Sequence, residues 1–143
     1  MQPLAFPRPY AFTTRTIDSR HEILDPLRQQ YVALTPEEWV RQNLVQFLIQ
    51  DRGYPRGLMA AEKFLEVHGQ PHRADLVVYD RQGSPLLVAE CKEPNVNISQ
   101  DTFNQIAHYN RALRARYLPT CRSWRGVASR PTYLPTGARC GPT

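Results

Sequence analysis

Residues 74–92 read ADLVVYDRQGSPLLVAECK, and this stretch decides the fold of the chain. Two largely apolar runs, Ala74 to Tyr79 and Leu86 to Lys92, flank a segment rich in Gly, Ser and Pro. Apolar runs of this length separated by turn residues predict two antiparallel strands. A further alternating run, Glu62 to Val67, ends in the turn Gly69-Gln70-Pro71 and predicts a strand before them. The three strands should form an antiparallel meander.

Helices are predicted on both sides of this meander. Thr35, Pro36 and Glu38 have the spacing of an N-cap, a first helical position and a capping-box glutamate. The apolar residues that follow share one helical stripe: Val40, Leu44, Phe47 and Leu48. We therefore expect a helix over 36–51. A second apolar stripe, which includes Phe103, predicts another over 100–114. The fold class is α/β, a mixed sheet led by the meander and flanked by helices.

Charged side chains interrupt the two apolar runs at positions that can meet in one site. Side chains alternate faces along a strand, so Glu90 and Lys92 point to the same side, and a neighbouring strand can place Asp75 beside them. Hydrolysis of a phosphodiester needs a hard cation, an activated water and a positive group near the developing charge. Carboxylates suit Mg²⁺, and a lysine can orient or help to deprotonate the water.

The spacing of Asp75 and Glu90-Cys91-Lys92 resembles the D…(D/E)-x-K core of the PD-(D/E)xK nuclease superfamily. The second predicted helix adds Gln105 and Tyr109 as Q-x-x-x-Y, which resembles the signature of RecB-like members. Longer stretches are similar to stand-alone proteins of the type I restriction enzyme R protein N-terminal domain family: TPEEWVRQNLVQFL, RADLVVYD and LLVAECKEPNVNISQDTFNQIAHYN.

This resemblance implies a restriction-endonuclease-like core and a metal-dependent deoxyribonuclease that acts on DNA with Mg²⁺ or Mn²⁺. It also implies a role for each matching residue: Asp75 and Glu90 as metal ligands, Lys92 as the catalytic lysine, Gln105 and Tyr109 as supporting or DNA-contacting residues, and Glu38 as a further metal-proximal group.

Simpler interpretations stay open beside these roles. Asp75, Glu90 and Lys92 fit the solvent face of a half-exposed sheet, with a surface ion pair contributing less than about 1 kcal/mol. The capping box alone explains Glu38. Two further functions are a catalytically inactive nucleic-acid-binding or assembly module on the same scaffold, and a protein-interaction domain without nucleic acid. His68 and His72 are four residues apart, but the Gly and Pro between them exclude a helical metal pair.

The length and composition limit the class of protein and its domain organisation. A chain of 143 residues suits one domain, and we expect an irregular segment over 1–20, a core over 21–118 and an irregular basic tail over 119–143. From residue 102 onward there are 7 arginines and no acid, and a shifted reading frame near 115–122 is one hypothesis for this change. Three cysteines without a C-x-x-C pair, and no apolar run of the roughly 18 residues that a membrane span requires, favour a cytoplasmic protein. The sequence leaves the oligomeric state open.

Overall fold

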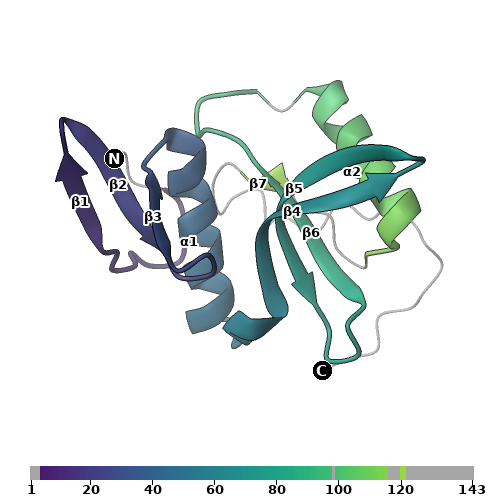
Figure 1. Cartoon of the computed structure of the whole chain (residues 1–143), viewed down its shortest axis with the longest axis horizontal. Helices are drawn as coiled ribbons and strands as arrows, with labels where there is room; N and C mark the ends of the chain where they lie inside the picture. The colour runs from purple at the N-terminus through teal and green to yellow at the C-terminus, as the bar shows by residue number, and fades with distance from the viewer. Residues whose placement is uncertain (1–3, 98, 116–119, 122–143) are drawn as a thin grey trace.

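The computed structural model describes residues 4–97, 99–115 and 120–121, which form two sheets and two α-helices (Figure 1). The strands are β1 (Thr14–Ile17), β2 (Arg20–Asp25), β3 (Gln30–Ala33), β4 (Met59–Val67), β5 (Gln70–Tyr79), β6 (Pro85–Cys91) and β7 (Thr120–Cys121). The helices are α1 (Pro36–Gln50), α2 (Gln100–Leu113) and a short 3₁₀ helix (Arg56–Leu58). The strand orders are β1-β2-β3 in one sheet and β4-β5-β6-β7 in the other.

The predicted meander is confirmed, because β4, β5 and β6 pair in antiparallel succession. Strands β4 and β5 are longer than predicted and pair up to Val67 and Gln70 at the hairpin tip. His68 and Gly69 form the connection with positive φ angles of 51° and 73°. Two consecutive left-handed residues match the right-handed twist of a tight hairpin, so this turn allows the ladder to extend to its end.

Helix α1 matches its predicted bounds to within one residue, and its predicted stripe is buried. Thr35 accepts a hydrogen bond from the Glu38 backbone N–H at 3.1 Å, as an N-cap should. The stripe packs on the face of β5 and β6 that carries Leu76, Val78 and Ala89, which forms the main core. Figure 1 shows α1 between the N-terminal sheet and the larger sheet.

Residues 4–20 contain more regular structure than predicted. Residues 14–17 form β1, which pairs with β2, and β2 in turn pairs with β3. Tyr10 belongs to the main core, and its hydroxyl donates a hydrogen bond to the carboxylate of Asp51 at the end of α1. A Pro-rich sequence without periodicity does not reveal such long-range anchoring.

Tyr10→Phe is expected to lower the free energy of unfolding at neutral pH by about 1–2 kcal/mol, because it removes a hydrogen bond to a charged group. Burial and the Asp51 carboxylate together raise the pKa of Tyr10 to about 12, so its hydroxyl keeps its proton at neutral pH. Urea denaturation measures the change. Tyr31→Phe, in β3, is the matched control and should change stability by less than about 0.5 kcal/mol; equal losses in both variants would contradict the anchor.

Helix α2 also appears where predicted, but its Phe103 is 43% exposed instead of facing inward. The side chain of Thr102 is buried in its place. Thr120 and Cys121 form β7, which pairs in parallel with β6, and the rest of the predicted irregular tail lies outside the described residues. No helix in the described parts of the chain combines the length and apolar character needed to cross a membrane.

Candidate active site

The sheet brings the two predicted carboxylates together. Leu76 on β5 pairs with Ala89 on β6, and Asp75 and Glu90 are the neighbours of this pair on the same side. The backbone N–H of Cys91 donates a hydrogen bond to Asp75 Oδ2 at 2.7 Å, which fixes the Asp75 carboxylate against β6. Cross-strand neighbours project to the same face of a sheet, which explains why two acids share one site.

Glu90 lies at the centre of the site and is 6% exposed. Its Oε1 is 3.5 Å from Lys92 Nζ and 3.5 Å from Gln105 Nε2, so a residue just after β6 and a residue of α2 each supply a group to it. Its Oε2 is buried and has no hydrogen-bond partner among the described residues. Burial and the charge of Asp75 raise the pKa of Glu90 to about 7, although Lys92 opposes this shift.

Asp75 shares part of this environment. Burial raises its pKa, while the Cys91 N–H and the Arg41 guanidinium oppose the shift. Arg41 Nη1 lies 3.9 Å from Asp75 Oδ1 and 3.4 Å from its backbone oxygen. Two carboxyl groups in one partly buried site are therefore harder to ionise than they are in water, a property typical of functional sites and also of structural ion-pair networks.

The six residues singled out from the sequence do not all meet. Asp75, Glu90, Lys92 and Gln105 form one group through the contacts above. Tyr109 lies one helical turn after Gln105 in α2, and its side chain is outside what the structure describes. Its predicted role therefore stays a prediction.

Glu38 is held by other side chains. Arg28 Nη2 contacts its Oε1 at 2.9 Å, Gln42 Nε2 contacts the same oxygen at 2.8 Å, and Arg41 contacts both oxygens. The capping box is only half formed, because the Thr35 N–H bonds to the Ala33 carbonyl oxygen instead of the Glu38 side chain. The α1 acid whose charge contributes to the raised pKa of Glu90 is the exposed Glu37.

Sequence reasoning missed Arg41 and Glu62. Arg41 is 7% exposed and contacts both the Glu38 carboxylate and Glu62. Its Nη1 lies 2.6 Å from Glu62 Oε1. Glu62 adopts φ of +54° beside Asp75, between the Ala61–Leu76 and Lys63–Ala74 pairs of the β4–β5 ladder. Partial burial opposes ionisation of Glu62, but Arg41 and Arg73 lower its pKa overall. The one available signal was the i, i+3 spacing of Glu38 and Arg41.

The residues that fit a divalent cation are Asp75 and Glu90. The Oε2 atom of Glu90 is buried without a hydrogen-bond partner in the described part of the chain, whereas buried carboxylate oxygens normally have one. A divalent cation such as Mg²⁺ or Mn²⁺, which prefers oxygen ligands, would satisfy this atom. Within the described ranges no three His, Cys, Asp or Glu side chains are grouped so that they could hold a metal ion. The two carboxylates therefore fit a cation whose other ligands are waters and substrate oxygens, as is usual for Mg²⁺.

Comparison with known proteins bears on the family of the chain. A search of the curated proteins found no match to the chain. The family model of the type I restriction enzyme R protein N terminus (HSDR_N) matches residues 36–122. This match covers more than half of the 143 residues and extends from the start of α1 to just beyond β7. The chain therefore belongs to the type I restriction enzyme R protein N-terminus family.

Proposed function

We propose that this chain is a metal-dependent nuclease of the PD-(D/E)xK superfamily, with a restriction-endonuclease-like core, which hydrolyses phosphodiester bonds of DNA. The observation that carries the proposal is the convergence of Asp75, Glu90 and Lys92 beside the end of the β5–β6 ladder. Membership of a restriction-enzyme family supports DNA as the substrate. The orphaned Glu90 Oε2 supports a cation at the carboxylates.

Each side chain has a task that its position supports. Asp75 and Glu90 would hold Mg²⁺ or Mn²⁺, which when bound polarises the scissile phosphate and makes water a better nucleophile. Lys92 Nζ, 3.5 Å from Glu90, would orient the attacking water and offset charge that develops on the phosphate. Gln105 would keep the Glu90 carboxylate in place from α2.

Incubation of plasmid DNA with the protein and Mg²⁺ or Mn²⁺ tests the proposal. Asp75→Asn and Lys92→Gln should each reduce the cleavage rate by about 10²–10³-fold, the usual effect of removing one electrostatic group from a reaction centre. Asp18→Asn and Lys63→Gln make the same chemical changes at exposed positions and should leave cleavage within about threefold of the unmodified protein.

Two results would contradict the nuclease. One is unchanged cleavage by the site variants, and the other is absence of cleavage by a folded protein with either metal. Salt-sensitive DNA binding without cleavage would instead support the inactive binding module. The observation that favours this second function is that the Glu38 carboxylate already binds Arg28, Arg41 and Gln42.

A further inference from the structure

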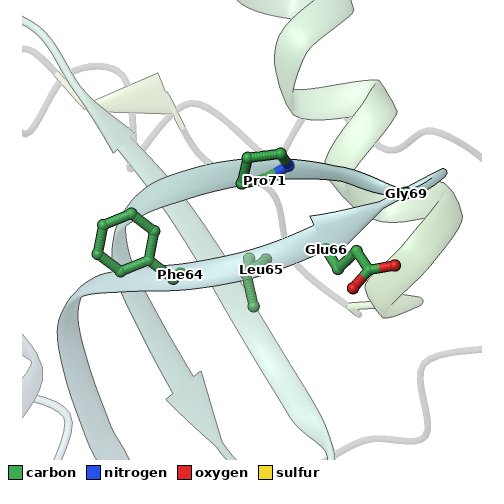
Figure 2. A pocket seen from close by; sticks show the side chains of 5 residues that line it. All are labelled: Phe64, Leu65, Glu66, Gly69 and Pro71. Atoms are coloured by element: carbon green, nitrogen blue, oxygen red, sulfur yellow. The ribbon is translucent and has the colours of Figure 1, made fainter.

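The most exposed large apolar side chain in the described part of the chain is Phe64, on β4. It is 70% exposed, whereas Phe103 on α2 is 43% exposed and Phe47 is buried. Figure 2 shows its ring projecting from the hairpin of β4 and β5, at the end away from the turn. The figure also shows the side chains that line a shallow hollow beside this ring: Phe64, Leu65, Glu66, Gly69 and Pro71. A phenylalanine in this position gives up the free energy of burial, which a bound partner would restore.

Phe64 lies on the same side of the hairpin as the candidate active site. It pairs with Arg73 across the β4–β5 ladder, and paired side chains project to one face. Arg73 Nε is 2.8 Å from Glu62 Oε2, and Glu62 Oε1 is 2.6 Å from Arg41 Nη1. The same Arg41 atom is 3.9 Å from Asp75 Oδ1. Since Arg73 also precedes Asp75 by only two residues on β5, about 7 Å along a strand, Phe64 is close to the carboxylates of the site.

The charges around Phe64 favour a base at the ring and a phosphate at its neighbour. Arg73 is cationic, and its side chain is 57% exposed, so an anion can reach it. Glu62 binds the same guanidinium, but a guanidinium carries five N–H donors and can bind two anions at once. Glu66 lines the hollow with Phe64, and its negative charge repels phosphate from there. A nucleobase, which is neutral and planar, suits the ring and the hollow, and the phosphate attached to it suits Arg73.

We propose that Phe64 stacks on an unpaired nucleobase of the DNA substrate, and that Arg73 binds the backbone phosphate beside this base. The substrate at this site is then a single-stranded segment, because a base within a duplex stacks on its neighbours and presents only its edges. At about 3.4 Å per nucleotide, a distance of about 7 Å places the base about two nucleotides from the bond that is cleaved. The inference rests on the proposed nuclease function and names the substrate class of the same site.

Fluorescence anisotropy of a labelled single-stranded oligonucleotide, with the matching duplex in parallel, tests the inference in metal-free buffer. Asp75→Asn is the parent protein, because it removes one negative charge that repels DNA from the site. Phe64→Leu in this parent should weaken single-strand binding about tenfold, a usual effect of losing one base–aromatic stack. Duplex binding should change by less than about twofold, since no duplex base reaches the ring.

Salt dependence separates the stacking contact from the phosphate contact. Phe64→Leu should leave the slope of log affinity against log salt unchanged, because stacking releases no counterions. Arg73→Gln should reduce this slope by about 0.7, the value for one phosphate contact on a single strand. Phe64→Tyr should bind like the parent, because a tyrosine ring also stacks on a base.

Phe103→Leu is the matched control, since Phe103 is an exposed phenylalanine on α2, and it should leave both affinities within about twofold of the parent. A second measurement uses 2-aminopurine, a base whose fluorescence falls on stacking, at successive positions of the oligonucleotide. The parent and Phe64→Tyr should quench it at one position, and Phe64→Leu should not. Because Phe64 is 70% exposed, these substitutions should leave the fold intact, which circular dichroism checks.

Failure of this inference is distinct from failure of the nuclease. Absence of cleavage of plasmid and single-stranded DNA by the unmodified protein, with Phe64-dependent binding retained, contradicts the nuclease alone. Equal single-strand affinity of the parent and Phe64→Leu, or equal losses in Phe64→Leu and Phe103→Leu, overturns the stacking contact, whatever the cleavage assay shows.

Discussion

The Glu90→Gln protein is expected to be more stable than the unmodified protein at alkaline pH, and to cleave DNA about 10²–10³-fold more slowly. The reason is the cost of ionising a buried carboxyl group. The pKa of Glu90 is about 7 in the folded protein, against 4.5 for an unperturbed glutamate. Between these values the unfolded chain releases a proton that the folded chain keeps, so stability falls as pH rises through this window.

Above about pH 7 the full penalty applies, and a shift of this size corresponds to the order of 3 kcal/mol. Gln cannot ionise, so Glu90→Gln should recover most of that free energy at about pH 8 and little of it at about pH 4. Thermal and urea denaturation at both pH values, in a metal-free buffer, measure the effect. A divalent cation should stabilise the unmodified protein more than the variant, because binding to the folded state alone adds stability.

Glu93→Gln provides the control, because it makes the same change at an exposed position just beyond β6. Its stability should follow that of the unmodified protein at both pH values, within about 0.5 kcal/mol. If Glu90→Gln is no more stable at about pH 8 than Glu93→Gln, Glu90 does not carry the raised pKa. If it cleaves DNA normally, Glu90 is not a metal ligand.

Local sequence signals predicted the parts of the site that depend on a single ladder. The turn residues between β5 and β6 fix the register, and strand alternation then places Asp75, Glu90 and Lys92 together. The N-cap and the apolar stripe similarly gave α1 to within a residue. In each case the residues that determine the structure lie within about twenty positions of one another, so the sequence pattern predicts it.

Features that depend on long-range contacts were not predictable in the same way. The ring of His68, in the β4–β5 turn, lies 5.2 Å from that of His108, in α2 about forty residues later. β1 depends on pairing with β2, and its four residues are all exposed, so it has no apolar alternation to reveal it. Phe103 fits a helical stripe by spacing but lies on the exposed side, because Thr102 occupies the inward position.

The interpretation of Glu38 shows the limit most clearly. Its spacing fits a capping box, and the family resemblance implies a metal-proximal group, yet its carboxylate is bound by Arg28, Arg41 and Gln42. Arg28 also bonds to the buried Asp25 of the N-terminal sheet. The network therefore connects the N-terminal sheet, α1 and the β4–β5 ladder, and no single segment contains enough of it to be recognised.

Arg41 should accordingly be the residue of this network that tolerates substitution least. Arg41→Met removes the charge that Glu38 and Glu62 share inside the protein, and leaving buried carboxylates without their partner typically costs about 3–5 kcal/mol. Urea denaturation at neutral pH measures the loss. Arg73→Met is the matched control: Arg73 also binds Glu62, at 2.8 Å, but its side chain is 57% exposed, so its loss should cost less than about 1 kcal/mol.

The effect of Arg41→Met should also depend on pH in a defined direction. The lowered pKa of Glu62 means that its ionised form stabilises the fold above the ordinary glutamate pKa of 4.5, and that this contribution is lost as pH falls below it. The difference between the unmodified protein and Arg41→Met should therefore be largest near neutral pH and shrink at about pH 3–4. Equal losses for Arg41→Met and Arg73→Met, or a difference that does not change with pH, would show that packing of the Arg41 side chain, and not its charge, holds α1 against the strands of the site.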